Sequence, residues 1–248
     1  MVHGLKGEKL DLILHSPGGS TEAVEALVTY LRSKFSHIRV VIPYAAMSAA
    51  TMLSCAANII TMGKHSFIGP IDPQIILNTP LGTQAVPAQA ILEQFNKAKD
   101  ECVDPKKLGT WLPILGQYGP ALLVQCEHAL TLSKELVSKW LNLYMLSSKP
   151  NSKEKAEQVA KTLADHSLFK SHGRHINREQ AKEIGLDIED LESDQKFQDL
   201  VLSVFHSTTH TFDATPAVKI IENHEGKAFI KLLQQVVVPP GGREPKSQ

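Results

Sequence analysis

Two segments of the chain follow the same plan, in which a short apolar run of β-forming residues leads through a turn of small residues into a helix. The first run covers residues 10–14, and apolar residues then recur from Ala23 to Leu31 at the spacing of one helix face. The second run covers 38–42 and precedes a helix of unusually small residues over 48–57. Alternating strands and helices predict parallel strands joined by right-handed crossovers, and therefore an α/β fold.

The first turn reads His-Ser-Pro-Gly-Gly-Ser and is built for close approach of its backbone to another group. Pro17 fixes the backbone angle φ, whereas Gly18 and Gly19 lack a Cβ atom and can adopt positive φ. We expect Ser20 or Thr21 to cap the following helix. In parallel sheets, turns of this kind lie at the edge where ligands bind.

The second turn places Ser48 at the start of a helix. A serine there lies near unpaired backbone N–H groups and the positive end of the helix dipole, which stabilise negative charge on a bound carbonyl oxygen. The N–H groups of Gly18 or Gly19 and of Ala49 would then form an oxyanion hole, in which one donor lowers a barrier by roughly 3–4 kcal/mol. Each turn by itself is also typical of an ordinary strand-to-helix connection.

Taken together with Gly-Pro-Ile-Asp-Pro-Gln at 69–74, the two turns resemble the serine dehydrogenase proteinase family. Its relatives include signal peptide peptidase A and the proteolytic subunit of Clp protease. An Ala-x-x-x-Gly-Leu segment at 181–186 also resembles that superfamily, and the resemblance covers residues 10–191. It implies the ClpP/crotonase-like fold, a mainly parallel sheet of repeated β-β-α and βαβ units flanked by helices. It further implies a serine peptidase with Ser48 as nucleophile, a polypeptide substrate and a homo-oligomer.

The general base stays open, because the sequence offers several candidates. A serine hydroxyl is a weak nucleophile until a neighbouring group takes its proton. Clp-type relatives use a histidine, and His65 is the nearest one to the matching position. Relatives of signal peptide peptidase A use a lysine, and Lys97 is our first choice, ahead of Lys99 and Lys64. A lysine base has to be desolvated, whereas most lysines on such helices are solvated.

Two other functions are compatible with the same turns. Crotonase-type enzymes use two N–H donors to hold an acyl-CoA thioester, but they need no serine at the helix start, and this chain has no basic cluster for the CoA phosphates. A catalytically inactive scaffold or peptide-binding protein is the other alternative, supported by the lack of an evident base. A serine-directed probe and a CoA titration would separate these alternatives from the peptidase.

Composition narrows the class of protein further. The 248 residues carry 26 basic and 26 acidic side chains without a basic stripe, which argues against nucleic-acid binding. Three cysteines without a C-x-x-C pair favour a reducing compartment, and no signal peptide or bilayer-spanning run is seen, so we expect a cytoplasmic protein. No dinucleotide fingerprint or pyridoxal phosphate lysine is recognisable, so we expect no cofactor. The fold usually has a strand before the first turn, so we expect one upstream or a sheet trimmed at its edge.

We expect Asp72 and the histidines beyond the two turns to have structural roles, not catalytic or metal-binding ones. Asp72 is the one carboxylate in 69–87, a Pro-, Gly-, Asn- and Thr-rich stretch predicted as a loop over the site, and we interpret it as a turn-forming residue that accepts backbone N–H bonds. Irregular spacing favours capping or solvated roles over metal binding for three histidines: His166, His172 and His175. His206 and His210 have helical spacing but no accompanying carboxylate, so we expect no metal site.

The remaining elements are predicted from periodicity. Short strands are expected at 58–62 and 65–68, and strand-like runs at 217–221 and 227–233 flank a turn. Helices are expected at 88–99, 119–146, 155–163 and 178–184, with a polar loop at 100–107 and Pro and Gly breaks in 111–118. We divide the chain into a catalytic domain at 1–191, a helix-and-hairpin extension at 192–238, which we expect to pack on a neighbouring subunit, and a disordered tail at 239–248.

Overall fold

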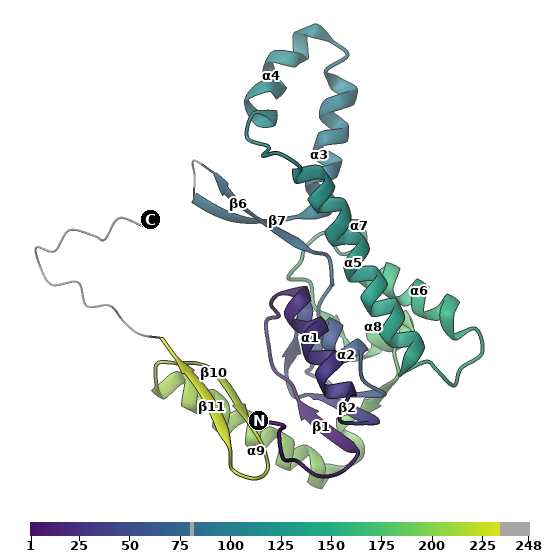
Figure 1. The fold of residues 1–248 in the computed structure, drawn as a ribbon, viewed down its shortest axis with the longest axis vertical. Coiled ribbons are helices and arrows are strands. Elements are labelled where there is room, and N and C mark those ends of the chain that lie inside the picture. The colour runs from purple at the N-terminus through teal and green to yellow at the C-terminus, as the bar shows by residue number, and fades with distance from the viewer. Residues whose placement is uncertain (80–81, 234–248) are drawn as a thin grey trace, which may run out of the picture. The chain divides into compact units, whose positions relative to one another are not determined.

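The computed structural model describes residues 1–79 and 82–233 (Figure 1). The chain divides into two compact units, of which the larger is Gly7–Gln195. The smaller combines Met1–Lys6 with the chain from Lys196 onward. The tail predicted to be disordered at 239–248 lies outside the described residues.

A parallel sheet forms the centre of the larger unit. Its strand order is β1-β2-β4-β9, and every neighbouring pair is parallel. These strands are β1 (Lys9–Ile13), β2 (His37–Ile42), β4 (Ile59–Met62) and β9 (Ile188–Asp190). The α/β fold with parallel strands is therefore confirmed, although β9 had no recognised signal in the sequence.

Burial along the strands explains why they read as continuous apolar runs. Val40, Val41 and Ile42 of β2 have no exposed surface, as expected for a central strand covered on both faces. Residues of β1, at the end of the strand order, instead alternate between exposed and half-buried. Helix α1 (Thr21–Arg32) follows β1, and Ser20 caps it by accepting a hydrogen bond from the N–H of Ala23, which confirms the predicted cap.

A second, smaller sheet continues from the ends of these strands. Strand β3 (Ala45–Ala46) pairs in parallel with β5 (Phe67–Ile68), and β5 pairs antiparallel with β8 (Ile176–Asn177). Helix α2 (Ala49–Cys55) begins directly after Ser48, and all its residues are buried. Small side chains allow this close packing, since α2 contacts both α1 and α5 (Leu122–Leu143).

The stretch predicted as a loop over the site contains a β-hairpin instead. Strands β6 (Gln74–Thr79) and β7 (Gly82–Pro87) pair antiparallel along their whole length (Figure 1). Ile75, Leu77 and Val86 pack against a small apolar cluster of Ala88, Ile91, Leu122 and Cys126. The loop prediction was wrong for 74–79 and 82–87. Pro and Gly suggested a loop, but they lie at the ends of these strands, and the apolar side chains between them form a strand pair because they pack on this cluster.

Helices follow the hairpin. They are α3 (Ala88–Glu101), α4 (Pro105–Leu115), α5, α6 (Ser152–Leu163) and the short α7 (His166–Phe169). The predicted polar loop at 100–107 was wrong at 100–101, which end α3, and again from 105 onward. Asp104 accepts a hydrogen bond from the N–H of Lys106 and caps α4, with Pro105 in its first turn. Pro113 lies inside α4 without ending it.

Helix α8 (Arg178–Ile184) begins and ends as the sequence predicts. Asn177 and Gln180 form a capping box, in which each side chain accepts a hydrogen bond from the other's backbone N–H. Gly185 ends the helix with φ of 112°, a conformation that favours glycine. A 3₁₀ turn, η1 (Leu191–Ser193), follows β9.

The smaller unit contains a long helix and a hairpin. Helix α9 (Gln195–Ala214) leads into β10 (Ala217–Glu222) and β11 (Ala228–Leu232), which pair antiparallel. Asn223 forms the predicted turn, since its side-chain oxygen accepts hydrogen bonds from the N–H groups of Glu225 and Lys227. Among the described helices of the whole chain, none combines the length and apolar character that crossing a bilayer requires.

Candidate active site

Ser48 occupies a strained position between β3 and α2. Its φ of 51° and ψ of −118° are unusual for a residue with a Cβ atom. The residue is half-buried, and its hydroxyl does not cap the helix that it precedes. Nucleophilic serines of α/β-hydrolases lie on a sharp, strained turn between a strand and a helix, and Ser48 has a strained backbone at the same kind of place.

Backbone hydrogen bonds join the two turns. The N–H of Ser16 donates to the carbonyl of Ala45 (3.0 Å), and the N–H of Met47 donates to the carbonyl of Ser16 (3.0 Å). This pairing brings Gly18 against Ser48: a Cβ atom added to Gly18 would lie 2.7 Å from the Met47 carbonyl oxygen and 2.9 Å from the Cβ of Ser48. Gly18 has φ of 109°, so both its space and its conformation favour glycine.

The N–H groups of these turns differ in their availability. The Gly18 N–H donates to the hydroxyl oxygen of Ser16 (3.1 Å). Within residues 1–79 and 82–233, no acceptor is found for the N–H of Gly19 or of Ala49, the first residue of α2. The structure therefore brings Gly18, Ser48 and Ala49 together and leaves two nearby donors for a bound oxygen.

Thr51 fixes this turn to the following strand. Its hydroxyl is fully buried, lies 2.8 Å from the Ala46 carbonyl and 2.9 Å from the Gly69 carbonyl, and accepts a hydrogen bond from the Gly69 N–H (3.1 Å). Gly69 packs so closely on Met47 that a Cβ atom there would collide with the methionine side chain. The chain thus leaves β5 directly beside the residue that precedes Ser48.

Asp72, three residues after Gly69, is hydrogen-bonded to two histidines. Its side chain is 1% exposed, and its two oxygens accept hydrogen bonds from Nδ1 of His166 (2.9 Å) and Nδ1 of His172 (2.8 Å). Gln74 adds a longer contact at 3.3 Å. The interpretation of Asp72 as an acceptor of backbone N–H groups was wrong, and so were the capping or solvated roles for these two histidines. No group of three or more His, Cys, Asp or Glu side chains in the described chain is arranged to hold a metal ion.

The predicted base candidates lie elsewhere in the described chain. Lys97 and Lys99 are exposed on α3, a helix that packs against α4, α5 and β7. The His65 ring Nε2 pairs with the Pro43 carbonyl (2.8 Å), and the Lys64 backbone N–H donates to Glu192 (2.7 Å). No side-chain hydrogen bond or ion pair between any of the four and Ser48 is found in the part of the chain that the structure describes.

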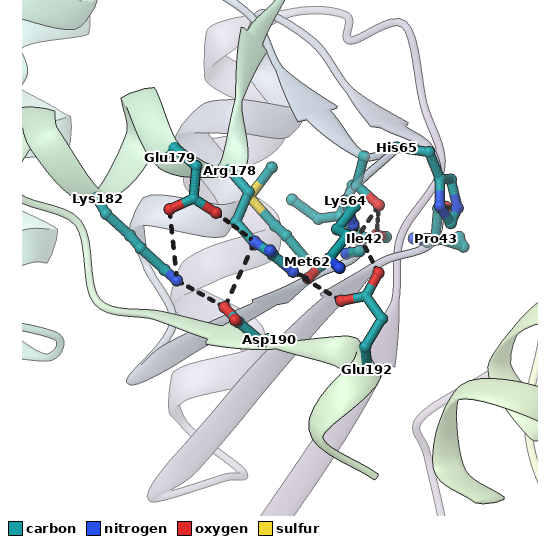
Figure 2. Close-up of polar contacts among 12 residues, drawn as sticks. Ile42, Pro43, Met62, Lys64, His65, Arg178, Glu179, Lys182, Asp190 and Glu192 are labelled. Carbon is teal, nitrogen blue, oxygen red and sulfur yellow. Dashed lines mark hydrogen bonds and ion pairs between the residues drawn. The ribbon is translucent and has the colours of Figure 1, made fainter. Parts of the chain in front are cut away.

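Lys64 and His65 instead border an ionic cluster that joins α8 to the sheet (Figure 2). The Arg178 guanidinium is nearly buried and donates to Glu179 (2.9 Å) and Glu192 (2.6 Å). The Lys182 ammonium donates to Asp190 (2.6 Å). These contacts hold the Ala-x-x-x-Gly-Leu segment in place and indicate a structural role for it.

Comparison with known proteins adds the family. The model of the ClpP-like SDH-type serine proteinases matches residues 4–206. The chain belongs to this family. It is also 28% and 29% identical to two uncharacterized proteins of Methanocaldococcus jannaschii, over 74% and 72% of its own length. The aligned parts make up 54% and 51% of those proteins, so the chain spans about half the length of the relatives it matches. No solved structure matches the chain.

Proposed function

We propose that the protein is a serine peptidase that hydrolyses peptide bonds through an acyl-enzyme on Ser48. The observation that carries the proposal is the strained backbone of Ser48 at the start of α2, directly against Gly18. Membership of a serine proteinase family supports the same reaction class. A polypeptide substrate follows from that class.

The proposed reaction uses the two turns in sequence. The Ser48 hydroxyl oxygen attacks the carbonyl carbon of the substrate, and the carbonyl electron pair moves to the oxygen. N–H groups of the first turn, from Gly19 or Gly18, and of Ala49 stabilise this oxyanion. The tetrahedral intermediate then collapses and expels the amine, which leaves with the proton that the general base took from the Ser48 hydroxyl. Water attacks the ester that remains on Ser48 as the base takes its proton, and the base returns this proton to the serine oxygen as the carboxylic acid leaves.

The remaining expectations from the sequence also stay proposals. We propose a ClpP/crotonase-like catalytic domain at 1–191 and an extension at 192–238. The three free cysteines favour a cytoplasmic location. Lys97 stays the sequence-based hypothesis for the base, and since it is exposed on α3 it would need another surface to desolvate it.

A fluorophosphonate probe tests the nucleophile. Intact-mass spectrometry should show a single adduct on the wild type and none on Ser48→Ala. Ser54→Ala is the matched control, because Ser54 lies in the same helix with its hydroxyl bonded to the Ala50 carbonyl (2.9 Å), and it should label like the wild type. A folded wild type that does not react would contradict the peptidase and favour the scaffold alternative.

A further inference from the structure

The antiparallel pairing of β5 with β8 extends beyond the two short strands. Ile68 lies opposite Ile176 in this pair. Four residues further along the same register, Asp72 should lie opposite His172, and the side chains of these two residues are hydrogen-bonded (2.8 Å). The register of the small sheet therefore describes how the loop before β8 lies against the segment after β5.

Arg174 lies between the strand pair and the Asp72 contact. The register places it opposite Pro70, halfway along the segment that joins β5 to Asp72. The next residue, His175, stacks its ring on Phe67 with 3.6 Å between the ring centroids. Phe67 and His175 occupy diagonal positions of this register, so the stacking fixes the loop directly beside Arg174.

Ser48 lies on the other side of Pro70. Strand β3 pairs in parallel with β5, with Ala46 beside Ile68. The Gly69 N–H still donates to the Ala46 carbonyl (3.2 Å), so this pairing extends past the end of both strands. Continuing it by one more residue places Pro70 beside Ser48.

Ser48, Pro70 and Arg174 thus form one row across three neighbouring segments. Neighbouring strands lie about 4.8 Å apart, so the Cα atom of Arg174 lies about 10 Å from that of Ser48. An extended peptide covers this distance in about three residues, and the arginine side chain adds a long methylene stem. A guanidinium in this row can therefore reach a substrate group close to the bond that Ser48 attacks.

The Arg174 guanidinium is available to a ligand. The residue is exposed, and its backbone N–H donates to the Ser171 carbonyl (3.1 Å). Its side chain has no hydrogen-bond or ion-pair partner within residues 1–79 and 82–233. The loop 170–175 carries a second cation, Lys170, and no acidic residue. Both oxygens of Asp72, on the opposing segment, already accept hydrogen bonds from histidines.

We propose that Arg174 binds a carboxylate of the substrate within about three residues of the bond that Ser48 attacks. The proposal rests on the proposed peptidase function and adds a substrate class to it, namely peptides with an acidic group beside the cleavage site. A guanidinium donates two parallel N–H bonds to a carboxylate, and these are stronger than hydrogen bonds between neutral groups. Unmodified polypeptides supply this group from Asp or Glu side chains or from their C-terminus.

Cleavage of a peptide mixture tests the proposal and separates these two sources. The full chain is incubated with peptides from a protein digest, prepared once with free and once with amidated C-termini, and mass spectrometry locates the new ends. Ser48→Ala serves as the blank. Cleavage at one fixed position relative to Asp or Glu would identify the side chain as the source. Cleavage at a fixed distance from the C-terminus, lost on amidation, would identify the terminal carboxylate.

Variants of Arg174 show whether this residue causes the preference. Arg174→Gln should lower kcat/KM about 10-fold for a peptide with the carboxylate and leave the matched neutral peptide unchanged. Arg174→Glu should instead favour a peptide with Lys at the same position, which the loss of a structural contact would not produce. Lys170→Gln is the matched control, because it removes the same charge from the same loop but lies four residues from the row, and it should cut like the wild type.

Fluorophosphonate labelling of Ser48 separates this proposal from the peptidase function. Both Arg174 variants should label at the wild-type rate, because the probe has no carboxylate. A wild type that labels but cuts no peptide, or cuts without preferring a carboxylate, would overturn the role of Arg174 alone. Equal losses in Arg174→Gln and Lys170→Gln would do the same. A wild type that neither labels nor cuts would overturn the proposed peptidase and this inference with it.

Discussion

The two adjacent glycines of the first turn differ in the space around them: Gly18 has no room for a side chain, whereas Gly19 has open space. Substituting each in turn tests whether the close approach of Gly18 to Ser48 is needed. Gly18→Ala has to place a Cβ atom 2.7 Å from the Met47 carbonyl at φ of 109°, whereas a Cβ atom on Gly19 would meet nothing within 4 Å. We expect Gly18→Ala to lower the free energy of unfolding by about 1–3 kcal/mol and to slow Ser48 labelling strongly, because the two turns must separate. Thermal unfolding and fluorophosphonate labelling measure the two effects.

Gly19→Ala is the matched control for this change. It should unfold at nearly the wild-type temperature, since Gly19 is not among the glycines with positive φ. Equal stability of the two variants would show that the close approach of Gly18 to Ser48 is not needed by the fold.

At the residue scale, sequence reasoning works where the signal is local. Gly18 and Ser48 each lie in a short motif whose geometry follows from the turn itself, and the structure brings them together. Asp72 and His172 form a pair only through folding, at a separation of 100 residues. A single carboxylate in a Pro-rich stretch and irregularly spaced histidines gave no signal of such pairing, so local turn and loop roles were the natural but wrong interpretations.

Helix α8 is held to the sheet through charged side chains, and this makes its stability sensitive to pH. The hydrogen bond from Lys182 is the largest effect lowering the pKa of Asp190, and the charge of Arg178 acts in the same direction. Burial alone would raise the pKa of Glu192, but hydrogen bonds from the Lys64 N–H and Arg178 lower it overall. Both carboxylates therefore contribute stability above their ordinary pKa values of 3.8 and 4.5, and lose it as the pH falls through the lower folded values.

Removing Arg178 should weaken this attachment. Arg178 is 7% exposed and its guanidinium donates to two carboxylates, so we expect Arg178→Ala to cost about 2–3 kcal/mol of unfolding free energy near neutral pH. The loss of wild-type stability below about pH 4.5 should become shallower in the variant. Urea unfolding across pH 3–7 measures both effects.

The control for that change is an exposed ion pair. Lys227→Ala removes a partner of Glu225 at the surface, where such pairs contribute little. If Arg178→Ala were no more destabilised than Lys227→Ala, the cluster in Figure 2 would not be what holds α8.

At the element scale, the two segments whose secondary structure was predicted wrongly were misjudged for the same reason. The β6–β7 hairpin and the start of α4 were predicted as loops because Pro, Gly and polar residues suggested irregular structure. In the hairpin, the side chains of Ile75 and Leu77 have an apolar cluster from α3 and α5 to pack on, and that tertiary contact decides the conformation. Helices with long apolar stripes, such as α5, were predicted well because their periodicity extends over many turns.

At the scale of the whole molecule, the C-terminal hairpin has apolar side chains that are exposed within the part of the chain that the structure describes. Ile221 and Phe229 pair directly across β10 and β11 and are 42% and 51% exposed. A two-stranded hairpin is marginally stable in water unless another surface packs on it. Since family resemblance implies a homo-oligomer, we predict that this face contacts a second copy of the chain.

Sedimentation velocity tests this prediction on the full chain. The wild type should sediment as a homo-oligomer, and replacing Ile221 and Phe229 together by lysine should shift it to a smaller species, because two charges would have to be buried in the contact. Leu200→Lys on α9 is the control, since Leu200 is 59% exposed but lies outside the hairpin, and its sedimentation should not change. A wild type that remains monomeric at every concentration would refute the assembly, whereas an unchanged oligomer of the double variant would place the contact on another surface.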